Sequence, residues 1–145
     1  MYNRFLRREW IKCEGRRVHN NAFKPRLIYS NQRWELSCFE ISELTKLEIK
    51  DIASCNGIVL NNKAPVGYCT FINKINSKTQ KLNKLFIEKD DNPLHHCNLL
   101  GWEKYEWDSP DKDVCDINEI LNLITENWVN DIVDYENDND NLNKI

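Results

Sequence analysis

The chain has 145 residues, of which 41% are hydrophobic and 30% are charged, and its formal net charge at pH 7 is −3. This composition is typical of a soluble globular protein. No apolar run approaches the roughly 20 residues that a membrane-spanning helix needs, and no hydrophobic stretch follows the basic first residues. We therefore expect a cytoplasmic protein with no membrane partner.

The first regular elements are predicted from residue 5 onward. Residues 5–18, "FLRREWIKCEGRRV", alternate loosely around Phe5, Leu6, Trp10 and Ile11, which is compatible with a short helix, an edge strand or an ordered arm. Residues 33–42, "RWELSCFEIS", alternate with the period of a β-strand. A short helix is predicted over 45–54, where Thr45 and Glu48 have the spacing of a capping box and Asn56-Gly57 supplies the stop.

Three further strands and a second helix follow. The strands are predicted over 64–72, 84–90 and 94–102, and residues 103–113 form an acidic loop. Apolar residues recur at helical spacing over 116–133 and predict an amphipathic helix; they are Ile117, Ile120, Leu121, Ile124, Trp128 and Ile132. Residues 134–145 are polar and acidic, so we expect a mobile tail.

This order of elements predicts an α+β fold. With short connections, it favours a small, mostly antiparallel sheet packed by a short helix and a C-terminal amphipathic helix. The expected organisation is a single domain over 1–133 followed by the acidic tail over 134–145.

Charge is unevenly distributed along the chain. Residues 1–33 carry +7, residues 34–85 carry +2 and residues 86–145 carry −12. One interpretation is that the two ends neutralise each other or are simply solvated. The other is that the arginine-rich end meets RNA, DNA or an acidic protein surface. The acidic end disfavours nonspecific nucleic-acid binding by the whole molecule, because it repels phosphate.

Six cysteines are scattered through the chain without a CxxC motif. In a reducing compartment such thiols are most simply small buried hydrophobic residues, and nothing indicates a disulfide framework. They are Cys13, Cys38, Cys55, Cys69, Cys97 and Cys115.

The segment "DDNPLHHCNLLGW", residues 90–102, contains the main candidate for catalysis. His95 follows a turn, where a neutral imidazole is accessible and can act as a general base or hydrogen-bond a ligand; the alternative is a structural histidine that closes the turn. We expect His96 and Cys97 to pack in the sheet. Zinc would need two ligands beyond His95 and Cys97, and none has diagnostic spacing, so no metal or cofactor is predicted.

A second candidate site lies in "RRVHNNAFKPR", residues 16–26. Arginine forks and asparagine amides suit a phosphate or carboxylate, so we predict an anion site built from Arg17, Asn20, Asn21, Lys24 and Arg26. The alternative is a solvated basic loop. The chain contains no Walker loop, GxGxxG, HExxH, nucleophile elbow or zinc-finger spacing.

Residues 16–101 resemble small, largely uncharacterised bacterial proteins with an N-x-A-F loop, an L-S-V-type strand and a D-x-x-P-x-H segment. The residues that carry the resemblance are Asn21-Ala22-Phe23, Leu36-Ser37, Pro93, His95 and Gly101. His96 and Cys97-Asn98 depart from the pattern. The resemblance implies a bacterial or phage origin and a shared loop-plus-histidine arrangement, in a group of proteins often associated with mobile or defence loci.

Three functional hypotheses follow. The leading one is an accessory or binding protein without catalysis of its own, which meets a protein partner in a larger, defence-related assembly through the aromatic residues Tyr105 and Trp107. The alternative is a small enzyme acting on a phosphate-bearing substrate such as a nucleotide or RNA end. Its cleft would join His95, which transfers protons, to the Asn20–Asn21 loop, where Arg17 and Lys24 hold charge. The third is nucleic-acid binding by the basic N-terminal segment.

Overall fold

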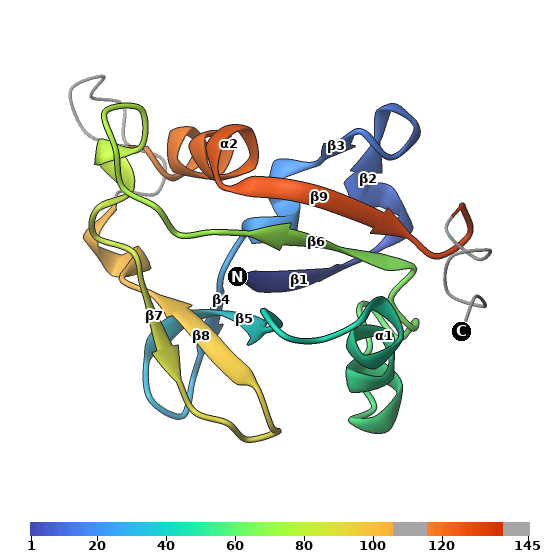
Figure 1. Cartoon of the computed structure of the whole chain (residues 1–145). Coiled ribbons are helices and arrows are strands. Elements are labelled where there is room, and N and C mark those ends of the chain that lie inside the picture. The colour runs from blue at the N-terminus through green and yellow to red at the C-terminus, as the bar shows by residue number, and fades with distance from the viewer. Residues whose placement is uncertain (106–115, 138–145) are drawn as a thin grey trace.

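A computed structural model of the protein describes residues 1–105 and 116–137 (Figure 1). Its helices are α1 (Lys46–Cys55) and α2 (Ile117–Asn127), with short 3-10 turns η1 (Arg8–Trp10), η2 (Cys13–Gly15), η3 (Asn20–Phe23), η4 (Gln80–Leu82) and η5 (Trp102–Lys104). The strands are β1 (Tyr2–Leu6), β2 (Ile11–Lys12), β3 (Arg17–Val18), β4 (Arg26–Ile28), β5 (Arg33–Glu40), β6 (Gly67–Phe71), β7 (Phe86–Lys89), β8 (His96–Leu100) and β9 (Val129–Asp134).

The strands form one large sheet and one small hairpin. The order in the large sheet is β7-β8-β5-β1-β6-β9, with β4 also paired to β5, and β2 and β3 form the separate hairpin. The pairings between these strands are antiparallel. The predicted α+β fold, a mostly antiparallel sheet with a short helix and a C-terminal helix, is confirmed. No helix within the described residues is long and apolar enough to cross a membrane.

The first strand lies inside the sheet. β1 pairs with β6 along its whole length and with β5 at its start, so Phe5 and Leu6 belong to an inner strand, whereas residues 8–10 of the same predicted segment form the short 3-10 turn η1. Successive side chains of a strand point to opposite faces, and the neighbours Phe5 and Leu6 accordingly enter two different apolar clusters.

These two clusters lie on the two faces of the sheet. The larger joins Leu6 and Phe71 to the apolar side of α2 and to Trp128. The smaller joins Phe5 to Ile49 of α1 and its neighbours. Figure 1 shows α2 and α1 at separate places around the central strands.

The helix predicted over 45–54 is confirmed at Lys46–Cys55. Both hydrogen bonds of the capping box are present: the Thr45 hydroxyl accepts from the Glu48 backbone N–H, and the Glu48 carboxylate accepts from the Thr45 backbone N–H. The local signal was sufficient here because the box satisfies two backbone donors within one turn.

The helix predicted over 116–133 is wrong in its last third. α2 ends at Asn127, and Val129–Asp134 is strand β9, which pairs with β6. Trp128, fully buried, donates its indole N–H to Lys74 O and marks the change of direction. Pairing to β6 satisfies backbone groups that a longer helix would have bonded internally. The strand continues through Asp134, one residue beyond the expected domain boundary; residues 138–145 of the expected tail lie outside the described part.

The prediction that the cysteines are buried is only partly confirmed. Cys38, Cys69 and Cys97 are buried, but Cys13 and Cys55 are exposed, and all five are free thiols. Cys115 lies outside the described residues. The prediction of burial is therefore wrong for Cys13 and Cys55, which lie in η2 and at the end of α1, where no apolar partner covers them.

Candidate functional site

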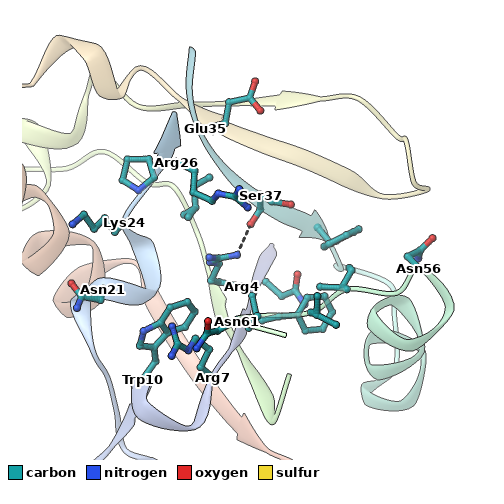
Figure 2. Close-up of a pocket in the computed structure, with 18 of the residues that line it drawn as sticks. Arg4, Arg7, Trp10, Asn21, Lys24, Arg26, Glu35, Ser37, Asn56 and Asn61 are labelled. Carbon is teal, nitrogen blue, oxygen red and sulfur yellow. Dashed lines mark hydrogen bonds between the residues drawn. The ribbon is translucent and has the colours of Figure 1, made fainter. Parts of the chain in front are cut away.

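A cleft opens where β1 and β5 separate. The two strands pair only at Tyr2–Glu40 and Asn3–Phe39, whereas β1 continues along β6. The resulting cleft has a volume of about 820 Å³, within the range of small-molecule sites. Its walls come from β1, η1, the η3–β4 segment, β5 and the loop after α1 (Figure 2).

One end of the cleft is strongly cationic. Its lining includes Arg4, Arg7, Lys24 and Arg26, and Glu35 is the only carboxylate among the lining residues. Glu35 is already paired with Arg33. Among the described residues, no carboxylate forms an ion pair with Arg4, Lys24 or Arg26. The cationic end therefore has an excess of positive charge.

Arg4 is the most constrained of these cations. Its Nε donates to Ala22 O at 2.8 Å, and its Nη1 donates to Ser37 O at 3.4 Å (dashed in Figure 2). Desolvation by burial, with a smaller contribution from the nearby charge of Arg26, lowers the pKa of Arg4 to about 10. The guanidinium stays charged at neutral pH, and backbone carbonyls hold it without neutralising it.

Trp10 provides an aromatic surface for two of the arginines. The guanidinium carbons of Arg4 and Arg7 lie 5.5 and 5.4 Å from its ring centroid. Cation–π attraction at such distances favours both positive charges beside the ring. Arg7 also pairs with Glu9 at 2.9 Å, so Arg4 keeps more of its charge for a ligand than Arg7 does.

The other end of the cleft is apolar. Ile58, Val59 and Leu60, from the loop after α1, line it together with Phe5 and Phe39. Val59 is 57% exposed, so this lip presents hydrocarbon to whatever enters. The cleft thus joins a cationic end to an apolar lip.

Asn3 adds an unsatisfied polar group to the lining. Its side chain is fully buried, and neither Nδ2 nor Oδ1 has a hydrogen-bond partner in residues 1–105 and 116–137. Buried amides nearly always make hydrogen bonds. An amide left unpaired beside a cleft indicates a place where a ligand would supply the partner.

The structure brings together only part of the predicted anion site. Asn21, Lys24 and Arg26 line the cleft. Asn20 does not, because its amide donates to Asn122 Oδ1 at 2.9 Å and ties η3 to α2. Arg17 lies in β3, beside a different hollow near α2. Sequence reasoning missed Arg4, Arg7 and Trp10, because β1 and η1 had not been placed beside η3.

His95 is not among the residues that line the cleft. It sits in the turn before β8 with φ +73° and is half-buried, and its backbone carbonyl accepts from Glu40 N–H at 2.8 Å. This hydrogen bond therefore holds the turn before β8 against the end of β5. The predicted juxtaposition of His95 with Arg17 and Asn20 does not occur at this cleft.

The neighbouring His96 forms a chain of three side chains. Its Nδ1 lies 2.7 Å from Asp90 Oδ1, and its Nε2 lies 2.7 Å from Ser37 Oγ. The Phe39 ring contacts the imidazole edge-on at 5.3 Å between centroids. The sequence predicted only that His96 packs in the sheet. It gave no sign of these hydrogen bonds, because Ser37 lies beside His96 only through the pairing of β5 with β8.

Asp90 is held as a carboxylate. Burial opposes its ionisation, but hydrogen bonds from Asn92 N–H, the His96 ring and the Asn98 amide outweigh burial and lower the pKa of Asp90 below its ordinary value. An ionised Asp90 accepts a hydrogen bond from the Nδ1–H of His96. The Nε2 lone pair of His96 is then free to accept from Ser37.

The predicted interface aromatics are not supported as a pair. Tyr105 is only 6% exposed. Its hydroxyl donates to Lys81 O at 2.7 Å and accepts from Lys84 N–H at 3.2 Å. The expectation of an exposed Tyr105 is therefore wrong, because its hydroxyl ties the end of η5 to the backbone at and just after η4. Trp107 lies outside the described residues.

No metal cluster is seen in the described part of the chain: no three His, Cys, Asp or Glu side chains are placed to hold an ion. Comparisons with protein-family models, with curated proteins and with solved structures find no match to this chain. The resemblance to small bacterial proteins therefore stays a prediction, and the function must be inferred from the cleft and the chain of side chains beside it.

Proposed function

We propose that this protein binds a phosphate-bearing molecule of about nucleotide size in the cleft between β1 and β5. The phosphate lies at the cationic end and the less polar body lies on the lip of Ile58, Val59 and Leu60. One observation carries the proposal: the guanidinium of Arg4 is desolvated and close to Arg26, yet neither has a carboxylate partner within the described residues.

The electrostatic argument is direct. Two like charges at the rim of a low-dielectric cleft repel each other, and an anion placed between them turns that repulsion into attraction. Guanidinium groups offer paired N–H donors that match the oxygens of phosphate. Lys24 adds a third positive charge at the same end.

The shape of the cleft supports a ligand with two parts. A volume of about 820 Å³ exceeds what inorganic phosphate needs, and the apolar lip would remain in water if only phosphate were bound. The base and sugar of a nucleotide would cover this lip, and the unpaired amide of Asn3 would meet a polar atom of the ligand.

This proposal keeps part of the predicted anion site and replaces its partners. Asn21, Lys24 and Arg26 remain, and Arg4 takes the place assigned to Arg17. The role as an accessory protein with a protein partner, in a bacterial or defence-related setting, remains a separate hypothesis that rests on the sequence alone.

Fluorescence titration with N-methylanthraniloyl-labelled AMP and ATP tests the proposal. The double variant Lys24→Gln/Arg26→Gln removes two surface cations of the cleft and should weaken binding at least about tenfold, since hydrogen bonds to charged groups contribute roughly 1.5–3 kcal/mol each. Arg17→Gln is the matched control, because this exposed arginine lies outside the cleft. Absence of binding at millimolar nucleotide, or equal losses in the two variants, would contradict the proposal.

A further inference from the structure

The hydroxyl of Ser37 lies at the junction of the cleft and the Asp90–His96 pair. Ser37 is exposed and lines the cleft, whereas the side chain of His96 behind it is only 14% exposed. We propose that Ser37, His96 and Asp90 form a hydrolytic triad that cleaves a carboxylic ester whose anionic group is held by Arg4 and Arg26. The ester cleavage is inferred from the three side chains themselves. Only the choice of an anionic substrate rests on the proposed function.

The hydrogen bonds run in the order that acyl transfer requires. Ionised Asp90 accepts from Nδ1 of His96, which leaves Nε2 to accept from Ser37 Oγ, and both contacts are 2.7 Å. An imidazole held in this tautomer by a carboxylate can remove the serine proton. The edge-on contact with Phe39 keeps the ring in this orientation.

Donors for a developing oxyanion are available on the cleft side of β5. The carbonyl of Ser37 accepts from Arg4 Nη1 across the cleft. In an extended strand the N–H and C=O of one residue point to the same edge, so the Ser37 N–H also faces the cleft. A backbone N–H at the nucleophile together with a nearby guanidinium can stabilise negative charge on a carbonyl oxygen.

The reaction has two balanced steps. In the first, Ser37 Oγ bonds to the ester carbon, and its proton passes to Nε2 of His96. The ester C–O bond then breaks, and the departing alkoxide takes that proton and leaves as an alcohol. In the second, water attacks the acyl-Ser37 ester while His96 accepts a water proton, and the serine recovers that proton as the carboxylic acid departs. Ser37 and His96 are catalytic residues, and Asp90 is a positioning residue that stays ionised throughout.

The first test is covalent labelling with a neutral, alkyl fluorophosphonate probe, located by mass spectrometry of peptides. We expect an adduct on Ser37, no adduct in Ser37→Ala, and labelling slowed at least about 100-fold in His96→Gln. Ser54→Ala is the matched control; it removes another exposed serine hydroxyl, which donates to Asp51 O, and should label as the parent does.

Asp90 needs its own readout because it also accepts from Asn92 and Asn98. Asp90→Asn should slow labelling, and Asp90→Glu should restore part of the rate. Thermal unfolding of each variant separates this effect from loss of fold. The inference is overturned if Ser37 stays unlabelled in natively folded parent protein, or if folded His96→Gln labels at the parent rate.

The Lys24→Gln/Arg26→Gln variant and the parent protein together distinguish this inference from the proposed function. The uncharged probe should label Lys24→Gln/Arg26→Gln as fast as the parent, whereas AMP should slow labelling of the parent alone. Labelling of Ser37 without nucleotide binding would support the triad and refute the proposed ligand. Nucleotide binding without labelling would do the reverse.

Discussion

Arg8 and Asp134 are joined by two parallel hydrogen bonds, although 126 residues separate them in the chain. Arg8 Nη1 lies 2.6 Å from Asp134 Oδ2, and Nη2 lies 3.1 Å from Oδ1. Asp134 is only 7% exposed. The contact holds the end of β9 against η1, the segment that also places Arg7 and Trp10 in the wall of the cleft.

This pair predicts a pH-dependent contribution to stability. The hydrogen bond from Arg8 lowers the pKa of Asp134, with the charge of Arg8 adding to it. Because the folded pKa is depressed, the stabilisation is complete above the unfolded value of about 4 and is lost as pH falls through the folded value. Asp134→Asn should therefore cost about 1–3 kcal/mol at pH 7 and less below pH 3, as measured by urea unfolding across pH.

The exposed pair of Arg7 and Glu9 is the control for this prediction. Glu9 is 61% exposed, and exposed ion pairs contribute little. Glu9→Gln should leave the free energy of unfolding nearly unchanged. Equal effects of Glu9→Gln and Asp134→Asn at pH 7 would show that the Asp134–Arg8 contact stabilises the fold no more than an exposed ion pair does.

Gly101 is predicted to resist substitution by alanine. Its φ is +99°, and a Cβ added there would lie 2.0 Å from Lys84 O. The Lys84 carbonyl cannot move aside without shifting the backbone that links η4 to β7, so Gly101→Ala should cost about 2–4 kcal/mol. Gly15 has a similar φ of +87° but nothing within 4 Å, and Gly15→Ala should cost only about 1–2 kcal/mol. Thermal unfolding of both variants measures the difference, and equal losses would contradict the steric argument.

Asn3 is predicted to affect ligand binding more than stability. Since its buried amide makes no hydrogen bond with the described residues, Asn3→Leu should leave the unfolding midpoint unchanged or higher, yet weaken nucleotide binding. Asn98→Leu is the contrast: Asn98 is also buried but donates to Asp90, so its loss should destabilise the fold. Destabilisation by Asn3→Leu equal to that of Asn98→Leu would count against a role for Asn3 in binding.

The cysteines should divide into two classes of reactivity. Burial raises the pKa of Cys69 to about 12 and also raises the pKa of Cys38 and Cys97. These thiols carry almost no thiolate at pH 7 and are screened from reagent. Iodoacetamide at pH 7.5 should therefore modify the exposed Cys13 and Cys55 within minutes and reach the buried three only after denaturant is added. Early modification of Cys69, located by peptide mass spectrometry, would mean that the larger core opens readily.

Strand and helix identities were largely predictable where the signal is local. The capping box of Thr45 and Glu48 and the alternation in β5 act over a few residues, so they could be read from the chain directly. Residues 129–134 could not. Ile132 fits the apolar spacing of a helix and of a strand alike, and the choice was made by the pairing edge that β6 offers.

The residues of the candidate site were also predictable from the sequence only in part. Lys24 and Arg26 were predicted from a basic segment, but Arg4 joined them only because β1 enters the middle of the sheet. Of the two adjacent histidines, His96 rather than His95 meets Ser37, because His95 lies in the turn before β8, whereas His96 begins β8 and the register with β5 sets it beside the serine.

The sequence by itself determined the α+β character, the capped first helix and the excess of positive charge in the N-terminal third, since these depend on composition and on contacts within a few residues. Only the tertiary structure decided where that charge gathers and which serine, histidine and aspartate meet, because strand order and register set distances between residues far apart in the chain.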